Sequence, residues 1–154
     1  MIVFSQVSIR CAQPSDIPVC KRIADSNRDA VGFLMTVVFS EAVAHGRLLV
    51  AEVNDAVVGF VRFNHRVRGT ETALYDLCVD QDMRYCGVGR ALIDGLVEEC
   101  RGSNRASIML RCPDGLPAND FYRKLNFQLC GCEQGRRREL RVWRLDTEAS
   151  MCSS

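Results

Sequence analysis

The sequence has 154 residues, 47% of them hydrophobic and 25% charged, and its formal net charge at pH 7 is +1. A chain of this length buries a core without disulfides or metals, and this composition is typical of a soluble globular protein. The near-neutral charge gives no reason to expect nucleic acid as a partner, and no stretch approaches the ~20 apolar residues of a membrane span. We therefore expect one domain over residues 1–154, with neither nucleic acid nor a membrane as a partner.

The nine cysteines are scattered, mostly through apolar segments, and no CxxC pair occurs among them. The start of the chain lacks the basic residues, apolar run and small-residue cleavage site of a secretory signal. We therefore expect a cytoplasmic protein whose cysteines are reduced and buried, with no metal site. A cysteine nucleophile would need a base, and the only histidines are His45 and His65.

The chain begins with an imperfectly alternating strand over residues 3–10, followed by a helix over residues 14–27. Ser15 is the predicted N-cap of this helix, because a serine oxygen accepts a hydrogen bond from an N–H group of the first turn. A second helix is predicted over residues 29–45, with Gly46 ending it.

An apolar run, GFLMTVVF, covers residues 32–39 and is too short to span a membrane. Packing into the hydrophobic core is the favoured interpretation of such a run. The alternative is that these residues form an apolar wall for a substrate.

From residue 47 onward the pattern changes to strands. The segments 48–53 and 57–63 are joined by Asn-Asp at 54–55, residues that tolerate tight hairpin turns. A second turn at 67–69 leads into a strand over residues 70–80. These three strands are expected to form an antiparallel meander.

The remaining elements are a helix that ends near Arg101 with Gly102 as its stop, a strand over 106–112, a helix over 116–126, and a hairpin of 127–132 with 139–145. The strand, helix and strand in succession form a crossover, so the strands 70–80 and 106–112 should be parallel.

The turn in MRYCGVGRAL, residues 83–92, joins a strand to a helix, and the rest of the chain is organised around it. Leu92 and Leu96 begin the apolar face of the helix at a spacing of four residues. Gly87 and Gly89 lack a Cβ, so the backbone can take positive φ and a ligand can approach several N–H groups. Because these donors lie at a helix N-terminus, they are suited to binding an anion.

The pattern Arg-x-x-Gly-x-Gly, formed by Arg84, Gly87 and Gly89, resembles the acyl-CoA pyrophosphate loop of the GCN5-related N-acetyltransferase (GNAT) family. Further along, A-x-x-FYRKLNF over residues 118–127 is similar to the A-x-x-FY-x-K-x-GF segment of the same family. The order of elements over residues 3–145 is also similar to that of the whole acetyltransferase domain.

Two positions depart from the family pattern. Gly115 stands where many members carry an asparagine that contacts the cofactor, and the nearby Asn119 is not the matching residue. Asn126 replaces a glycine, and asparagine tolerates the left-handed conformation better than most residues.

The resemblance implies an α/β (α+β) fold, with a mixed, mostly antiparallel sheet of about six or seven strands, about four flanking helices and splayed central strands. Its core would cover residues 3–145, with residues 147–154 frayed. The implied activity is transfer of an acetyl group from acetyl-CoA, a co-substrate, to a primary amine of a small molecule, peptide or protein, by direct attack in a ternary complex. A non-catalytic acyl-CoA-binding sensor or scaffold is the alternative. Edge strands in this fold often pair between subunits, so a homodimer is one allowed assembly.

The resemblance also implies where the cofactor binds. The backbone of Leu77, Cys78 and Val79 would pair with the pantetheine arm, with the Val79 N–H as an oxyanion donor. The pyrophosphate would meet the loop residues Arg84, Tyr85, Cys86, Gly87, Val88, Gly89, Arg90 and Ala91. The two arginines would add positive charge, although a solvated surface role is an equal alternative for Arg90.

Tyr122 is the predicted general acid, because a phenol with an ordinary pKa near 10 is protonated at neutral pH and can donate to the departing thiolate. Its alternative is a packed helix tyrosine with no catalytic role. Asp76 and Glu71, on the strand before the turn, are candidates for the general base, although a surface or salt-bridged carboxylate is the more common role. His65 is a further candidate.

In this family the acceptor commonly meets the first two helices and the terminal hairpin, here residues 26–39 and 130–138. The three arginines 136–138 could attract an acidic acceptor, but a charged hairpin end is the favoured interpretation. The sequence identifies neither the acceptor nor the preferred acyl chain.

Overall fold

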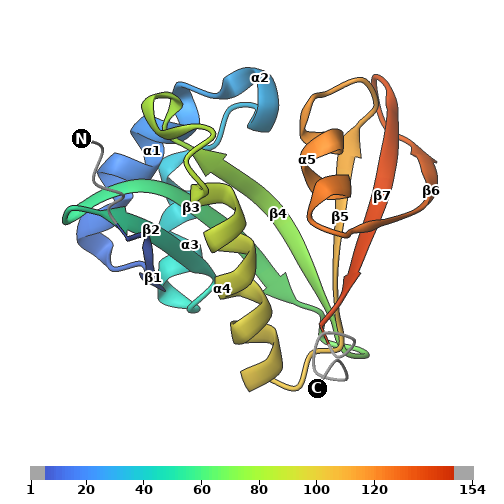
Figure 1. Cartoon of the computed structure of the whole chain (residues 1–154), viewed down its shortest axis with the longest axis horizontal. Helices are drawn as coiled ribbons and strands as arrows, with labels where there is room; N and C mark the ends of the chain where they lie inside the picture. Colours follow the sequence, from blue (N-terminus) through green and yellow to red (C-terminus); the bar gives the residue numbers. More distant parts are fainter. Residues whose placement is uncertain (1–5, 148–154) are drawn as a thin grey trace. The chain divides into compact units, whose positions relative to one another are not determined.

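The computed structural model describes residues 6–147 (Figure 1). Its strands are β1 (Ser8–Cys11), β2 (Leu48–Val53), β3 (Ala56–His65), β4 (Glu71–Val79), β5 (Ser107–Pro113), β6 (Gln128–Gln134) and β7 (Glu139–Asp146). Its helices are α1 (Ile17–Asp25), α2 (Arg28–Val31), α3 (Thr36–Ala44), α4 (Val88–Gly102) and α5 (Ala118–Lys124), with the 3-10 turns η1 (Pro14–Asp16) and η2 (Gln81–Met83). No helix within this range combines the length and apolar character needed to cross a membrane.

The strands form one mixed sheet in the order β1-β2-β3-β4-β5-β7-β6. The pairs β1-β2, β2-β3, β5-β7 and β6-β7 are antiparallel. β4 and β5 are parallel, as the crossover predicted, with Glu71 opposite Ser107 and Ala73 opposite Met109. The predicted fold class, α/β with a mostly antiparallel mixed sheet and flanking helices, is therefore confirmed.

The chain divides into two compact units. The first contains the chain up to residue 63 together with residues 76–96, and the second contains residues 64–75 and the chain from residue 97 onward. The elements β3, β4 and α4 each contribute residues to both units.

In the first unit, α1 and α3 pack on one face of the strands. The buried residues of this core come from both layers and are Cys20, Ile23, Ala24, Phe39, Ala42, Leu48, Val50, Phe60 and Cys78. The rings of Phe39 and Phe60 meet edge to face, with their centroids 5.3 Å apart. Helix and strand layers are thereby joined by close apolar packing.

The opposite face of these strands carries the first turns of α4. Gly59 follows Val58 and precedes Phe60 in β3, and it points away from the α1 and α3 core because neighbouring strand residues face opposite sides. A Cβ on Gly59 would lie 3.2 Å from Val88 Cγ1 and 3.3 Å from Leu92 Cδ1. The absence of a side chain at Gly59 therefore lets α4 approach β3 closely and fixes where the helix begins.

In the second unit, α5 lies beside a buried aromatic cluster. The Tyr122 ring makes edge contacts with Phe121 and Phe127, each with a centroid separation of 5.3 Å. The buried Trp143 donates from Nε1 to Asn119 Oδ1 at 2.9 Å. Asn119 also donates to the carbonyl oxygens of Pro113 and Leu116, so this side chain fixes the entry into α5.

The prediction of one helix over residues 29–45 is wrong, because the structure has two helices there, α2 and α3. The break begins at Gly32, whose φ of 72° lies outside the helical region. Apolar residues continue across this glycine, which made the two helices appear continuous. Gly46, with φ of 67°, does end the second helix as predicted.

The predicted N-cap at Ser15 is also wrong. The segment begins with η1, and α1 starts only at Ile17. Asp16 Oδ2 accepts a hydrogen bond from the Gln13 N–H at 2.7 Å and another from Arg10 Nη1 at 2.7 Å. A carboxylate can accept more donors than a serine hydroxyl, so Asp16 organises this turn.

Several predicted boundaries shift. β1 starts at Ser8, and residues 3–5 of the predicted first strand lie outside the described residues. Gly102 belongs to α4, and the left-handed residue that follows is Asn104, with φ of 57°. Thr147 is buried and its N–H donates to the Ala106 oxygen at 2.9 Å, while the rest of the predicted frayed tail, 148–154, lies outside the described residues.

The predicted turns are confirmed by their backbone angles. Asn54 and Asp55 have φ of 51° and 64°, as a two-residue hairpin turn requires. Gly69, before β4, has φ of 77°, and Asn126, after α5, has φ of 72°.

In the described part of the chain the cysteines form no disulfide bonds, and the predicted burial is confirmed for only half of them. Four are buried, namely Cys20, Cys78, Cys100 and Cys112, and four are exposed, namely Cys11, Cys86, Cys130 and Cys132. Cys152 lies outside the described residues.

Replacing Gly59 by alanine tests the close approach of α4. The added Cβ would lie 2.9 Å from the Cys78 carbonyl oxygen, which is backbone and cannot swing away. We expect Gly59→Ala to lower the free energy of unfolding, measured by urea denaturation, by roughly 1–3 kcal/mol. Gly102→Ala is the matched control, because Gly102 is exposed and a Cβ there meets no atom within 4 Å. Equal losses in the two variants would contradict the packing argument.

Candidate functional site

The segment between β4 and α4 is tied down where it leaves β4. The Asp80 N–H donates to the Val58 oxygen at 2.8 Å, which ties the end of β4 to β3. Asp80 Oδ1 accepts from the Asp82 N–H at 3.2 Å and so caps η2. The loop of residues 84–91 therefore starts from a fixed point.

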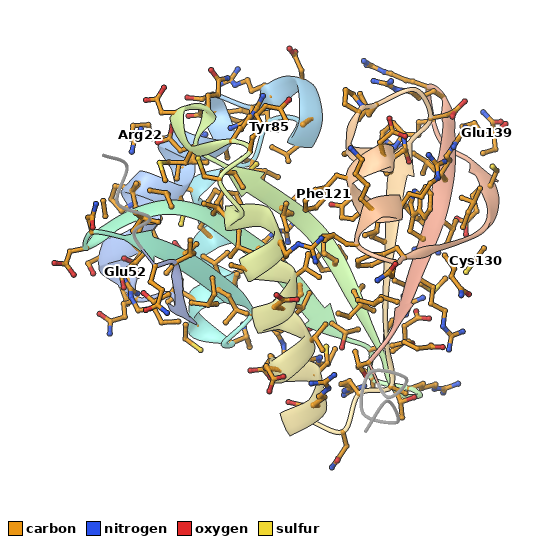
Figure 2. The ribbon with its side chains drawn as sticks, viewed as in Figure 1. Arg22, Glu52, Tyr85, Phe121, Cys130 and Glu139 are labelled. Atoms are coloured by element: carbon orange, nitrogen blue, oxygen red, sulfur yellow. The ribbon has the colours of Figure 1, made fainter. Side chains whose placement is uncertain are left out.

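Two residues of this loop have left-handed backbone. Tyr85 has φ of 65° and Gly87 has φ of 84°. Tyr85 is fully exposed and can be located in Figure 2 on the segment before α4. A tyrosine rarely adopts positive φ, so the loop holds a conformation that its own residues do not favour, a feature that is common at ligand-binding sites.

The start of α4 offers free backbone donors. The hydrogen bond from the Ala91 N–H to the Gly87 oxygen, 3.0 Å long, closes the first turn. The N–H groups before Ala91 have no carbonyl one turn earlier in the helix. With the helix dipole, they form a site that favours a negatively charged ligand such as a pyrophosphate.

The side chains of the loop differ in how they are held. Arg84 donates from Nη2 to Asn27 Oδ1, and the exposed Cys86 lies with Sγ 3.5 Å from the Arg84 oxygen. Arg90 is exposed, and Val88 is buried against β3. Both arginines are exposed, but Arg84 is held by Asn27, whereas no hydrogen bond or ion pair holds Arg90 within the described residues.

The predicted pantetheine-binding residues form the last part of β4 in the first unit. Cys78 is buried, and burial raises the pKa of its thiol to about 12, so it remains a neutral thiol. Leu77 and Val79 are half-buried. The register between β4 and β5 covers only residues 71–73 of β4, so residues 77–79 lie beyond it.

Asp76 is buried in the first unit and pairs with Arg62 of β3. Arg62 Nε donates to Asp76 Oδ2 at 2.7 Å. Burial raises the pKa of the Asp76 carboxyl, and the charge and hydrogen bond of Arg62 oppose that shift. Among residues 6–147 the second oxygen, Oδ1, has no hydrogen-bond partner, yet no fully buried polar side-chain atom is unsatisfied there. This oxygen must therefore reach the protein surface.

Glu71 and His65 belong to the second unit, and each has a partner. Glu71 Oε1 lies 3.3 Å from Arg66 Nε in an ion pair. His65 is buried, with Nδ1 2.7 Å from Thr72 Oγ1 and Nε2 3.3 Å from Glu99 Oε2. These contacts join β3, β4 and α4.

Tyr122 also lies in the second unit, buried on α5 among aromatic rings. Gly115, at the position where the family often has asparagine, has φ of 88° and forms the turn after β5. Asn119 uses its amide to hold Trp143 and the start of α5, as described above. Gly115 has no side chain, and the amide of Asn119 is already used within the protein, so neither residue takes the place of the family's asparagine.

The apolar run over residues 32–39 is mostly not core. Phe39 is buried, but Phe33, Met35 and Val37 have 60%, 57% and 52% of their surface exposed. Lys21 Nζ lies 4.4 Å and Arg28 Cζ 4.8 Å from the Phe33 ring centroid, so two cations cover this ring. The core interpretation is therefore wrong for most of the run, and the wall interpretation stays a prediction.

Two polar residues of the first unit were not found from the sequence, namely Asn27 and Arg62. Their partners Arg84 and Asp76 lie 57 and 14 residues away, and no local pattern indicates such contacts. Within residues 6–147, no group of three or more histidine, cysteine or acidic side chains converges as metal ligands would.

Comparison with known proteins shows which family the chain resembles. A model of the acetyltransferase (GNAT) domain matches residues 44–129. The 5-NmdU N-acetyltransferase of Pseudomonas phage PaMx11 is 28% identical over 127 residues, which cover 81% of this chain and 89% of the relative.

Two solved structures are similar over almost the whole chain. Ard1 from Thermoplasma volcanium is 25% identical with a TM-score of 0.81, covering 91% of this chain and 97% of that one. Arabidopsis thaliana Naa50, in complex with the bisubstrate analogue CoA-Ac-MVNAL, is 20% identical with a TM-score of 0.74, covering 90% of this chain and 97% of that one. Because the domain match covers more than half of the sequence, the chain belongs to the GNAT family of acyl-CoA-dependent N-acetyltransferases, which use acetyl-CoA as a co-substrate.

Proposed function

We propose that the protein transfers the acetyl group of acetyl-CoA to a primary amine of a small molecule, peptide or protein, which attacks the thioester directly within a ternary complex. The observation that carries this proposal is the left-handed turn at Gly87 ahead of α4, which leaves the first N–H groups of the helix available to an anion. The CoA pyrophosphate is an anion of that kind. Family membership supports the class of reaction.

The loop of residues 84–91 would bind the phosphates. Its backbone N–H groups would donate to the pyrophosphate oxygens, and Arg84 and Arg90 would add charge-assisted hydrogen bonds. The backbone of residues 77–79 would pair with the pantetheine arm, with the Val79 N–H donating to the developing oxyanion. The half-buried side chains of Leu77 and Val79 would then act only through packing.

Tyr122 is proposed as the general acid. The support is the family motif around it and the ordinary chemistry of a phenol, which is protonated at neutral pH. Its aromatic neighbours Phe121 and Phe127 hold the ring in one orientation. A fixed ring is what a positioned proton donor requires.

Asp76 is preferred to Glu71 as the general base. Asp76 is buried, which raises its pKa, and it keeps one oxygen without a partner within residues 6–147. Glu71 is instead half-exposed and paired with Arg66, as expected of a structural carboxylate. A base needs an available lone pair and a pKa closer to the working pH, and Asp76 meets both conditions better.

In the proposed reaction the acceptor ammonium first gives a proton to Asp76. The amine nitrogen then forms a C–N bond with the acetyl carbonyl carbon, and the C–S bond breaks. The departing thiolate takes a proton from Tyr122, and the new amide nitrogen releases its extra proton to solvent. The proton held by Asp76 then passes through solvent to the Tyr122 phenolate, which restores both groups. The products are the acetylated amine and free CoA.

The acceptor is proposed to meet the exposed apolar residues Phe33, Met35 and Val37 of the first unit. The phage relative is named for 5-NmdU, and the Naa50 complex holds an analogue that joins CoA to the peptide MVNAL. These names point to different acceptor classes, so both should be tried.

A cytoplasmic location is proposed because Cys11, Cys86, Cys130 and Cys132 are exposed free thiols, which a reducing compartment preserves. A homodimer is a further proposal. β6 lies at an edge of the sheet with all seven residues exposed, so its backbone is suited to pairing with a second copy.

Release of free CoA tests the activity. We expect acceptor-dependent CoA release, followed by chromatography, when the protein is given acetyl-CoA with peptides or 5-NmdU. Tyr122→Phe should lower kcat by roughly 10²-fold or more while leaving the KM for acetyl-CoA unchanged, because only the proton donor is lost. Tyr75→Phe, at an exposed tyrosine of β4, is the control and should retain activity. Tight acetyl-CoA binding without release for any acceptor would favour a non-catalytic binder.

Substitution of Gly87 tests the phosphate loop. Gly87→Ala forces an L-residue into positive φ, at a cost of about 1–2 kcal/mol, and displaces the N–H groups that the anion needs. We expect weaker CoA binding by calorimetry. Gly69→Ala imposes a similar strain in the turn before β4 and should leave CoA affinity unchanged. Equal affinities in both variants would remove the loop from the proposal.

The pH dependence of kcat/KM for the acceptor tests Asp76. The basic form of Asp76 is active and its pKa is raised, so activity should rise with pH through a limb above the ordinary aspartate range. Asp76→Asn should lower activity and lose this limb, retaining only the ionisation of the acceptor amine. Glu71→Gln should keep it. A limb that survives in Asp76→Asn and disappears in Glu71→Gln would reverse the assignment.

A further inference from the structure

Asn27 occupies the junction between α1 and α2 and is buried in the first unit. Its Nδ2 donates to the Ile23 oxygen at 2.7 Å and to the Val79 oxygen at 3.5 Å. Its Oδ1 accepts a hydrogen bond from Arg84 Nη2. One neutral side chain therefore joins the end of α1, the end of β4 and the first residue of the phosphate loop.

The amide of Asn27 can hold only one orientation in this place. Both of its donors face backbone carbonyls, so its oxygen must face the guanidinium of Arg84. A rotation by half a turn would place the amide oxygen against carbonyl oxygens and the amide nitrogen against a cation. The backbone of α1 and β4 thereby sets the direction of Arg84.

Arg84 differs from most arginines of this protein in the chemistry of its partner. Arg10, Arg62, Arg111, Arg123 and Arg141 all pair with carboxylates. Within residues 6–147, Arg84 has no carboxylate partner and only the neutral amide of Asn27. A carboxylate would hold the guanidinium equally well but would cancel its charge, whereas an amide orients it and leaves the charge available.

The same loop has a second arginine that lacks this support. Arg90 is exposed in the first turn of α4, and no hydrogen bond or ion pair holds its side chain within the described residues. Ordering such a side chain on a ligand costs conformational entropy that Arg84 has already lost. Arg84 is therefore the arginine that the fold has prepared for an anion.

We infer that Asn27 is a positioning residue for cofactor binding, which holds Arg84 as a charged, oriented donor toward the phosphates of CoA. The inference rests on the proposed function, because it needs the phosphates at the loop of residues 84–91. It adds a residue from the α1–α2 junction to the cofactor site, although Asn27 itself touches no phosphate.

Calorimetric binding of CoA to the full-length protein tests the inference. Arg84→Met, which keeps the apolar stem, should raise the Kd for CoA about tenfold, because a charge-assisted hydrogen bond is lost. Asn27→Ala should raise it by about three- to tenfold, and in the Arg84→Met background it should add nothing further. Independent, multiplying effects in the double variant would mean that Asn27 acts only on the backbone, which would overturn the inference.

Asn27→Asp separates orientation from charge. The new carboxylate would still accept from Arg84 but would neutralise it, so the Kd should rise as much as in Arg84→Met, and the salt dependence of binding should weaken. Asn27→Ala loses the same two donor hydrogen bonds to Ile23 and Val79 without adding a charge, so a larger rise in Kd in Asn27→Asp than in Asn27→Ala isolates the effect of neutralising Arg84. Wild-type affinity with wild-type salt dependence in Asn27→Asp would contradict the role assigned to the neutral amide.

Gln81→Ala is the matched control. The Gln81 side chain donates from Nε2 to the Ser26 oxygen at 2.7 Å, so it joins the same junction to η2, and its only link to Arg84 is through the backbone, which the substitution keeps. We expect its CoA affinity to stay within about twofold of the wild type. An equal loss in Gln81→Ala would mean that a loosened junction, rather than a misdirected arginine, causes the effect.

The inference stays testable if Asn27→Ala fails to fold, because an unchanged CoA affinity in Arg84→Met would still overturn it. A wild-type protein that binds no CoA would instead overturn the proposed function itself.

Discussion

The close contact of α4 with β3 at Gly59 is the constraint on which the rest of the first unit depends. Val88 and Leu92 occupy the space that any side chain at residue 59 would need. Since Val88 is the first residue of α4, this contact fixes the helix N-terminus beside the end of β4, which the Asp80–Val58 hydrogen bond holds in place. The seven residues in between, 81–87, must then reverse direction, and the left-handed angles at Tyr85 and Gly87 are the consequence. Packing of apolar residues thus creates the polar site, because it brings unpaired N–H groups to one point.

The partners of the arginines show how the same side chain serves two purposes. Arg10 binds both Asp16 and Glu52 and so joins β1, β2 and η1. These two carboxylates neutralise its charge within the protein. Asp16 is buried, so these part-buried ion pairs hold Arg10 in a fixed position. At Arg84 the fold provides a neutral amide instead, and the amide's own donors are satisfied by carbonyls of α1 and β4. The difference between a carboxylate and an amide at one position decides whether the charge remains available to a ligand.

Features determined by a few neighbouring residues could be predicted from the sequence. The Asn54–Asp55 turn, the glycine turn before α4 and the left-handed Asn126 all follow from local backbone preferences, and each was found. The break between α2 and α3 was missed because hydrophobic spacing continues across Gly32 and hides a single backbone angle. Asn27 and Arg62 were missed for a different reason. Their roles depend on partners that only the tertiary fold brings near, and their own types suggest an ordinary cap and an ordinary surface charge.

Two opposing effects set the pKa of Asp76, because burial raises it and the ion pair with Arg62 lowers it. Burial without a cation would keep the carboxyl protonated and useless as a proton acceptor, whereas an exposed pair would leave it with too low a pKa to hold the proton it receives. Arg62 contacts one oxygen only, so the charge is stabilised while a lone pair on the other oxygen stays accessible. Burial, and after it the charge of Asp76, raise the pKa of the Cys78 thiol two residues further along β4, so this thiol is neutral. The chemistry proposed for Asp76 therefore depends on β3, which places the half-buried Arg62 between the buried residues Val61 and Phe63 and beside Asp76 of β4.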